Sequence, residues 1–309
     1  MLKHKNILLV SIFICFVVTN RAIAQQDAQF SQYMYNNQSI NPAFAGNRGA
    51  LSLFAMHRSQ WLGFDNAPET YLFSAHTPIQ NSKLGFGLNF LSESIGPIDE
   101  TNASVDVSYW IQISKKFRLS FGLRFNANIF NISNNRLNPQ QANDPLLSNF
   151  NSEFNPNIGA GLFLHSEKSF MGLSVPAILQ RSNLDSNSFT AISVYRPTAY
   201  FYGGYVFDIF PFTKFKPASF LKLQEGSPLQ IDLSANFLFY EKFTLGAAWR
   251  WDASASFLAG FQVNQKCFIG YAYDIETTSL QQYHSGSHEL FIRFELFNRK
   301  SKLISPRFF

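Results

Sequence analysis

The sequence contains little charge and almost no cysteine. Only 15% of its residues are charged while 17% are aromatic, whereas a typical soluble domain has about 25% charged residues. One of the two cysteines, Cys15, lies in the apolar run near the N-terminus, which leaves Cys267 without a partner for an internal disulfide. The sequence therefore predicts a chain stabilised by hydrogen bonds and packing, with an unusually apolar exterior.

The only long apolar run belongs to the N-terminus. Lys3, His4 and Lys5 precede apolar residues 7–18, and Ala22-Ile23-Ala24 supplies a small-residue cleavage site, so residues 1–24 are predicted to be a secretory signal that is removed before Gln25. Beyond it, no stretch approaches the roughly 18 continuous apolar residues of a transmembrane helix. The net charge of +5 includes three positive residues of the signal, so the composition gives no support to nucleic-acid binding.

Catalytic and cofactor motifs are also missing. The sequence has no G-x-S-x-G, H-E-x-x-H or Walker motif and no cysteine pair with metal-binding spacing, so we expect no enzyme activity, no cofactor and no metal. Three weaker alternatives are open. The first is a metal bound by His284 and His288. The second is a divalent ion bound by an acidic loop that contains Glu93, Asp99 and Glu100. The third is hydrolysis at the rim of the barrel by His57, Ser59, Ser74 and His76.

What the sequence does contain is alternation. From Leu119 to Phe130, apolar residues occupy one parity and Ser120, Gly122, Arg124, Asn126 and Asn128 occupy the other. This pattern predicts a strand with one apolar and one polar face. The run also has about the length of the 9 to 11 residues that a tilted strand needs to cross a bilayer.

Similar runs recur along the chain and predict an all-β fold, a transmembrane antiparallel outer-membrane barrel of about 14 strands. Residues 50–309 form this barrel domain, and residues 25–49, which do not alternate, form an N-terminal segment in the periplasm or in the lumen. Arginines on the polar parity are expected to form ion pairs in the lumen or, alternatively, to line a pore. The predicted strands begin near residues 50, 70, 83, 102, 117, 155, 169, 198, 215, 229, 243, 255, 267 and 287.

Short and long connections alternate between these strands. Residues 114–116, 166–168, 241–242 and 264–266 form short turns, whereas 58–69, 93–101, 131–154 and 178–197 form longer loops. In outer-membrane barrels the short turns face the periplasm and the long loops face outward. We therefore expect the long loops on the cell surface.

Several short sequence motifs occur together and in a fixed order. The mature start contains Gln26-Asp27-Ala28-Gln29-Phe30-Ser31-Gln32-Tyr33-Met34 and then Ile40-Asn41-Pro42-Ala43-Phe44-Ala45-Gly46. Arg58-Ser59-Gln60-Trp61, Gly270-Tyr271-Ala272-Tyr273-Asp274-Ile275 and the closing Ser305-Pro306-Arg307-Phe308-Phe309 follow. Together they resemble the PorP/SprF family of type IX secretion and gliding-motility outer-membrane proteins of Bacteroidetes.

The resemblance implies a non-enzymatic outer-membrane protein that works with type IX secretion components, with a large secreted surface protein such as an adhesin that carries a C-terminal sorting domain, or with both. It would support export or surface attachment of that protein, and we favour a cargo-specific partner over a core component. The alternative is an outer-membrane channel or hydrophobic-solute transporter. Besides outer-membrane lipid, the expected contacts are with protein, and the candidate partner-binding residues are Phe30, Tyr33, Asn41, Pro42 and Trp61.

Overall fold

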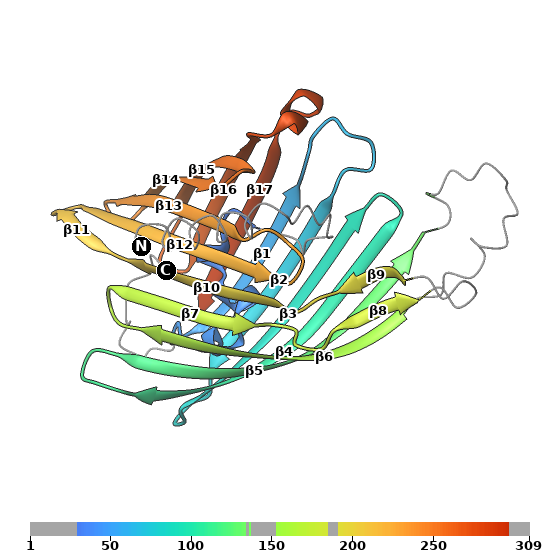
Figure 1. Ribbon diagram of the computed structural model, residues 1–309. Helices are drawn as coiled ribbons and strands as arrows, with labels where there is room; N and C mark the ends of the chain where they lie inside the picture. Colours follow the sequence, from blue (N-terminus) through green and yellow to red (C-terminus); the bar gives the residue numbers. More distant parts are fainter. Residues whose placement is uncertain (1–29, 134–135, 137–152, 185–190, 297–309) are drawn as a thin grey trace, which may run out of the picture.

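The computed structural model describes residues 30–133, 136, 153–184 and 191–296, and within them the chain forms a β-barrel (Figure 1). The predicted signal, residues 1–24, and the C-terminal residues 297–309 lie outside the described part. Among the described residues, no helix is long and apolar enough to cross a membrane. The barrel strands are β1 (Leu51–Ser59), β2 (Glu69–Pro78), β3 (Leu84–Ile95), β4 (Ile98–Gln112), β5 (Arg118–Ile132), β6 (Glu153–His165), β7 (Ser169–Val175), β10 (Thr198–Tyr205), β11 (Phe207–Phe210), β12 (Thr213–Gln224), β13 (Gln230–Phe239), β14 (Phe243–Arg250), β15 (Ser254–Gln262), β16 (Cys267–Glu276) and β17 (Ser287–Leu296).

Consecutive strands pair antiparallel, and two further pairings close the sheet. The first strand pairs with the last, β1 with β17, and β10 pairs with β12. Because β10 and β11 are two parts of one strand separated at Val206, the fifteen members of the sheet correspond to a closed barrel of 14 strands. The predicted fold class and strand number are confirmed, and the predicted strand starts fall close to the observed ones.

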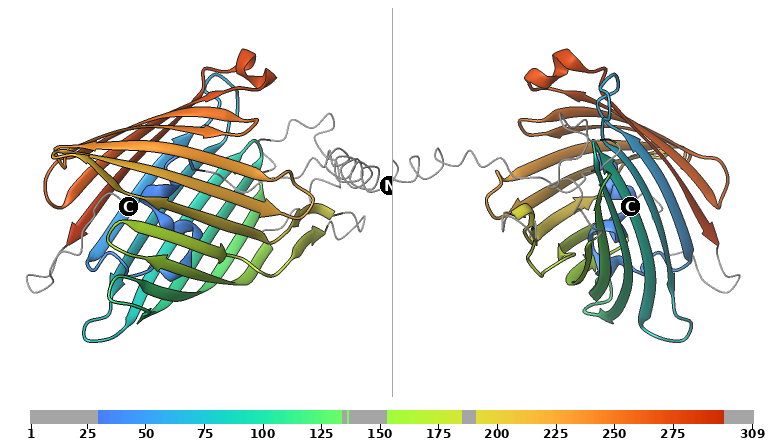
Figure 2. Two further views of the ribbon diagram at one scale, coloured as in Figure 1. Left: turned by 60° about the vertical axis from the view of Figure 1, so that its left-hand side comes forward. Right: turned by 90° about the vertical axis from the view of Figure 1, so that its right-hand side faces the viewer.

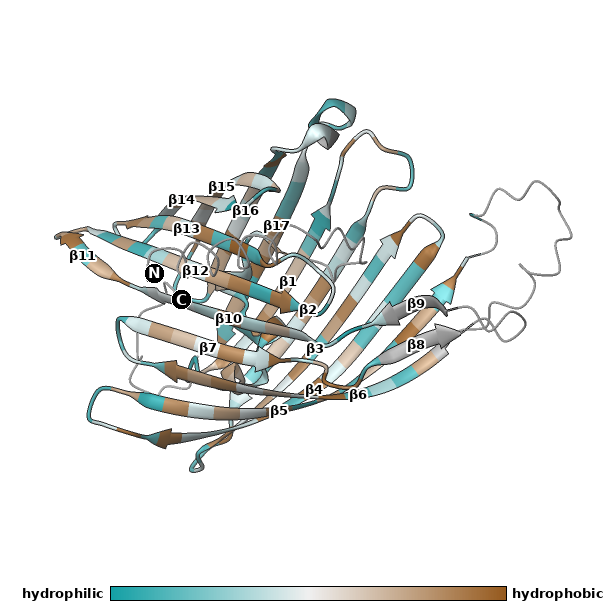
Figure 3. Cartoon of the chain, in the orientation of Figure 1, coloured by the Kyte–Doolittle hydropathy of each residue, from teal (hydrophilic) through white to brown (hydrophobic). Residues whose placement is uncertain are grey.

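The alternation in the sequence sets the two faces of the wall. On β5, Phe121, Leu123 and Phe125 point outward and are about half exposed, whereas Arg124 and Asn126 point inward and are buried. Figure 3 shows the same alternation of hydropathy along the other strands. The outer face is thus suited to lipid and the inner face to polar contacts, as in other outer-membrane barrels.

The strand connections define two ends of the barrel. The short-turn end carries residues 79–83, 113–117, 166–168, 211–212, 240–242 and 263–266, and the long-loop end carries the connections between β1 and β2, β5 and β6, β7 and β10, and β16 and β17. The β7–β10 connection contains a small hairpin of its own, β8 (Arg181–Leu184) with β9 (Ala191–Tyr195).

One expected loop is wrong. The sequence suggests a long connection over residues 93–101, but β3 runs to Ile95 and β4 begins at Ile98, and these two residues pair across a tight turn. Gly96 makes this turn possible because its φ of 57° is disfavoured for residues with a side chain. Glu93, Asp99 and Glu100 therefore lie on paired strands and do not form an acidic loop.

The N-terminal segment lies inside the barrel. Its helical turns η1 (Tyr33–Tyr35), α2 (Asn37–Ile40) and η2 (Pro42–Phe44) contact inward-facing side chains of strands on opposite sides of the wall. Figures 1 and 2 show this segment, in blue, enclosed by the strands. We call residues 30–50 the plug.

Candidate functional site

The plug has little structure that would persist on its own. Its three helical turns have only three or four residues each, and helices this short are unstable in isolation. Local signals still shape it. Asn41 accepts a hydrogen bond from the backbone N–H of Ala43 at 2.9 Å and so caps η2, in which Pro42 takes the first position. The wall must supply the remaining stability.

Aromatic side chains join the plug to the wall. The ring of Tyr33 lies 4.5 Å from that of Phe220 on β12, and Tyr35 lies 5.1 Å from Phe291 on β17. At the other end of the plug, Phe44 meets Phe163 of β6 edge to face at 5.2 Å. Rings at these separations attract one another beyond their buried area. The lumen therefore contains a hydrophobic core made jointly by plug and wall.

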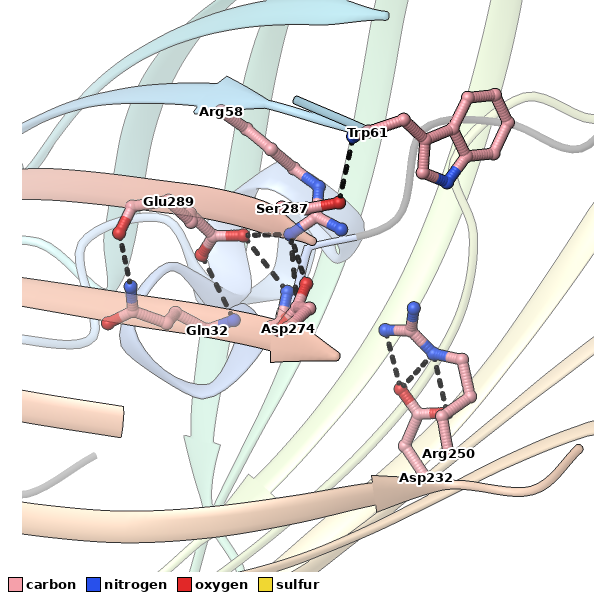
Figure 4. A network of polar contacts seen from close by, with 9 residues as sticks. Gln32, Arg58, Trp61, Asp232, Arg250, Asp274, Ser287 and Glu289 are labelled. Carbon is pink, nitrogen blue, oxygen red and sulfur yellow. Dashed lines mark hydrogen bonds and ion pairs between the residues drawn. The ribbon is translucent and has the colours of Figure 1, made fainter. Parts of the chain in front are cut away.

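A buried ion-pair cluster ties the beginning of the plug to the wall near the long-loop end (Figure 4). The guanidinium of Arg58 on β1 lies 2.6 Å from the carboxylate of Asp274 on β16 and 3.1 Å from that of Glu289 on β17. The plug adds its own donors. The N–H of Ser31 donates to Glu289 at 3.0 Å, and its hydroxyl donates to Asp274 at 2.6 Å. Both carboxylates are thus paired and hydrogen-bonded, which buried charges require.

A second cluster holds the middle of the plug. Arg124 on β5 binds both carboxylate oxygens of Asp106 on β4, at 2.7 and 2.9 Å. The same guanidinium donates to the backbone carbonyls of Gln38 and Ser39 at 2.6 and 2.7 Å. Arg124 therefore joins the wall to the plug, and its ion-pair partner is Asp106 on the neighbouring strand β4.

The other lumenal arginines are also paired. Arg250 lies 3.1 Å from Asp232, and Arg293 lies 3.6 Å from Glu295, which also pairs with Arg48 of the plug. Asp252, another acidic residue that follows Arg250 closely in the sequence, lies in the turn between β14 and β15. These contacts favour the ion-pair interpretation of the lumenal arginines over a pore lining.

Glycines in the wall make room for the plug. A Cβ atom at Gly122 would lie 2.1 Å from the backbone nitrogen of Ala43, and one at Gly85 would lie 2.2 Å from the carbonyl oxygen of Ala45. At Gly161 it would lie 2.1 Å from the carboxamide oxygen of Asn41. These distances are too short for a side chain, so the inner wall is complementary to the plug. Glycines on the lumenal parity of several strands are therefore the sequence signal that indicates the plug.

The structure brings together four of the five candidate residues. Phe30, Tyr33, Asn41 and Pro42 all belong to the plug and are buried. Asn41 donates to the carbonyl of Leu162 at 2.9 Å in addition to its cap. In this conformation these four residues contact the barrel wall.

Trp61 lies apart, in the loop after β1. Its backbone has a φ of 48°, a strained value for a bulky residue, and its N–H donates to the hydroxyl of Ser287 at 3.2 Å. Two hydrogen bonds join this loop to the one before β17, from the Leu62 N–H to the Gly286 carbonyl at 3.0 Å and from the Ser285 N–H to the Leu62 carbonyl at 2.8 Å. We call residues 60–68 and 277–286 the rim loops. Leu62, Phe64 and Tyr283 are exposed there.

The side chains considered for a metal site and for hydrolysis form hydrogen bonds within the protein. His284 accepts from the Gly286 N–H at 2.9 Å, and His288 lies 2.5 Å from the Tyr271 hydroxyl. His76 accepts from the Gly46 N–H at 3.1 Å, and Ser74 accepts from Asn36 at 2.8 Å, so both hold the plug. Within the described ranges, no group of three or more metal-binding side chains occurs.

Comparison with solved structures shows the fold. The monoaromatic hydrocarbon channel CymD is 10% identical to this chain with a TM-score of 0.50, over 87% of this chain and 94% of that one. Omp33 of Acinetobacter baumannii is 7% identical with a TM-score of 0.48, over 81% of this chain and 100% of that one. A search of curated proteins finds no match. One family model, described as type IX secretion system membrane protein PorP/SprF, matches residues 22–294.

Proposed function

This chain belongs to the PorP/SprF family of type IX secretion system membrane proteins, and on that premise we propose that it is a dedicated scaffold for one large secreted surface protein. Membership of the family, whose members are not enzymes, places it in the outer membrane and implies type IX secretion partners. Beyond family membership, we propose that the protein supports export or surface attachment of a single cargo with a C-terminal sorting domain, and that it does not transport a solute.

The occupied lumen is the observation that carries this proposal. An ion pair between Arg48 and Glu295, hydrogen bonds and aromatic contacts attach the plug to strands on opposite sides of the wall, and a channel would have to release these contacts to conduct. A barrel with a filled lumen offers instead its rim and loops as binding surfaces. The channel or hydrophobic-solute transporter is the competing function, and it requires a plug that leaves.

The rim loops are the proposed contact for the partner. A few residues, most often tryptophan, tyrosine and arginine, supply most of the binding energy in protein interfaces. The half-buried Trp61 and the exposed Leu62, Phe64 and Tyr283 lie on these two loops. Figure 4 shows the indole of Trp61 directed away from the ion-pair cluster beneath it. In this proposal the plug residues Phe30, Tyr33, Asn41 and Pro42 act indirectly, by keeping the plug in the lumen. The plug in turn supports the strands that carry the rim loops, because Ser31 donates to Glu289, the partner of Arg58.

Replacement of Trp61 tests the proposal. We expect Trp61→Ala to leave the barrel folded and to reduce the amount of a large surface protein or of type IX components that co-purifies with the tagged barrel in mild detergent. The matched control is Trp249→Ala, which removes an indole from the lipid-facing wall. Equal recovery of partners with both variants would reject the rim contact. Recovery of the barrel alone from wild-type membranes, with solute flux through the purified protein, would favour the channel.

A further inference from the structure

The outer face of the wall has an apolar depression of about 620 Å³ that crosses β4, β5, β6 and β7. Figure 1 shows these four strands side by side along the lower part of the barrel. The volume is within the range of small-molecule sites, about 300 to 1,000 Å³. Of the described residues that line the depression, none is charged. We call it the outer groove.

The shape of the groove follows from the sizes of its side chains. Nearer the short-turn end, a row of large side chains crosses the four strands, and it consists of Tyr109, Phe121, Leu162 and Leu173. In the next row, Ala160 lies between Leu123 and Val175. Ile178 lines the groove on the side of the long-loop end. Because Ala160 has the smallest side chain of these residues, the wall is recessed there.

The groove opens to the outside of the barrel and not to the lumen. On the inner side of the same strands the plug leaves no room, since a Cβ atom at Gly122 or Gly161 would lie 2.1 Å from atoms of Ala43 and Asn41. The outward side chains are accessible, and Leu123 is 57% exposed. The groove therefore faces the membrane, and its occupant must be apolar where it meets the wall.

The groove lies at the depth of one leaflet of the bilayer. Its two rows are represented on β4 by Tyr109 and Val107, and this strand ends at the short-turn end with Gln112. At about 3.4 Å per residue, the two rows lie about 10 and 17 Å from Gln112 along the strand, and less in depth because barrel strands are tilted. One leaflet contributes about 15 Å of hydrocarbon. The groove therefore lies beside the acyl chains of the leaflet at the short-turn end.

The turns at the ends of the same strands are positively charged. Lys115 and Lys116 lie in the turn between β4 and β5, and both are exposed. The turn between β6 and β7 contains Glu167 and Lys168, and the ammonium of Lys168 lies 2.7 Å from Asp208. Lys115 and Lys116 thus give this part of the rim a net positive charge. An anionic headgroup is complementary to this charge.

We propose that the outer groove binds a phospholipid with an anionic headgroup from the leaflet at the short-turn end. One acyl chain would lie in the groove over Ala160, and the phosphate would pair with the ammonium groups of Lys115 and Lys116. The rim loops lie at the opposite end of the barrel. This lipid site is therefore separate from the proposed contact with a protein partner and does not depend on it.

Native mass spectrometry of the full mature barrel tests the proposal. The protein is delipidated in detergent and then mixed with equal amounts of palmitoyl-oleoyl phosphatidylglycerol and palmitoyl-oleoyl phosphatidylcholine. We expect the barrel to retain one phosphatidylglycerol molecule at least about fivefold more often than phosphatidylcholine, the effect of one lysine near an anionic lipid. Heat-modifiable migration on gels verifies that the wild type and each variant are folded.

Two pairs of variants separate the groove from the charges. Ala160→Phe fills the groove and should remove the bound lipid, whereas Ala259→Phe adds the same ring to the outer face of β15 and should retain it. Lys115→Gln combined with Lys116→Gln should make the retention of the two lipids equal. Lys266→Gln, in the turn between β15 and β16, should leave the preference for phosphatidylglycerol unchanged.

Three outcomes would overturn the proposal. The first is equal retention of phosphatidylglycerol by the wild type and by Ala160→Phe. The second is equal retention of the two lipids by the wild type. The third is a wild-type barrel that dimerises without bound lipid and becomes monomeric in Ala160→Phe, because a second copy of the chain would then cover the groove.

Discussion

Arg58 shows how one residue connects the plug, the wall and the rim. It is buried, and its guanidinium neutralises carboxylates on two neighbouring strands while Ser31 of the plug completes their hydrogen bonding. Trp61 follows three residues later in the rim loop. A change at Arg58 should therefore affect stability first and the rim second.

We predict that Arg58→Met destabilises the barrel by about 3 kcal/mol or more, because it leaves two buried carboxylates without their cation. Urea unfolding of the protein in detergent micelles, followed by the gel shift between folded and unfolded forms, measures the change. The matched control is Arg136→Gln, which removes an exposed ion pair with Asp99 at 2.9 Å and should cost less than about 1 kcal/mol. Similar losses for both variants would contradict the role given to Arg58.

Gly122 provides a second test at the level of single residues. Since a Cβ there would lie 2.1 Å from Ala43, we predict that Gly122→Leu displaces the plug while β5 remains in the wall. Limited proteolysis of the plug should become faster. Leu123→Phe, which adds volume on the lipid-facing side of the same strand, should leave the proteolysis pattern unchanged. If Gly122→Leu is as resistant as wild type, the plug does not pack against β5 in solution as described.

At the level of elements, the barrel strands and the plug depend on different interactions. Strands pair with their sequence neighbours through ladder hydrogen bonds, so each is supported on both sides. The plug has only short helical turns and is held by side chains from many strands. We therefore expect the plug to be the element that can be removed without loss of the barrel.

Deletion of residues 26–46 tests this expectation. The truncated chain should still insert as a heat-modifiable barrel, and its single-channel conductance in planar bilayers should exceed that of the full chain because the lumen loses its main occupant. If the plug also positions the rim loops, the deletion should reduce co-purification of the protein partner. A truncated barrel with wild-type conductance and normal partner recovery would exclude a role for the plug in both.

At the level of the whole molecule, the orientation of the barrel decides which surface a partner meets. Short turns in outer-membrane barrels face the periplasm, and in this barrel the short-turn end lies opposite the rim loops. In that orientation the lysines of the turns at the short-turn end lie at the periplasmic rim; they are Lys83, Lys115, Lys116, Lys168, Lys242 and Lys266. We therefore predict that the rim loops face the cell exterior.

Cysteine labelling on intact cells checks this orientation. In a Cys267→Ser background, Phe64→Cys in the exposed rim loop should react with a membrane-impermeant maleimide. Lys116→Cys at the short-turn end should react only after the outer membrane is permeabilised. The opposite pattern would invert the barrel and remove the rim loops from the cell surface.

The barrel itself could be predicted from the sequence because its determinants are local. The parity of residues such as Phe121, Leu123 and Arg124 determines which face of a strand meets lipid. Residues 198–207 look ambiguous because aromatic side chains occupy both faces. The structure resolves this ambiguity, since Tyr200 and Tyr202 point inward into the core shared with the plug.

The sequence by itself determined the strands, their order and their outward apolar face. Its characteristic motifs also indicated the family. Only the tertiary structure decided that residues 30–50 lie in the lumen, that Arg124 pairs with Asp106, and that Arg58 pairs with carboxylates of two other strands. The physical reason is separation along the chain. An alternating strand is encoded within about a dozen residues, whereas the contact of Ser31 with Glu289 joins positions 258 residues apart and exists only once the barrel has closed.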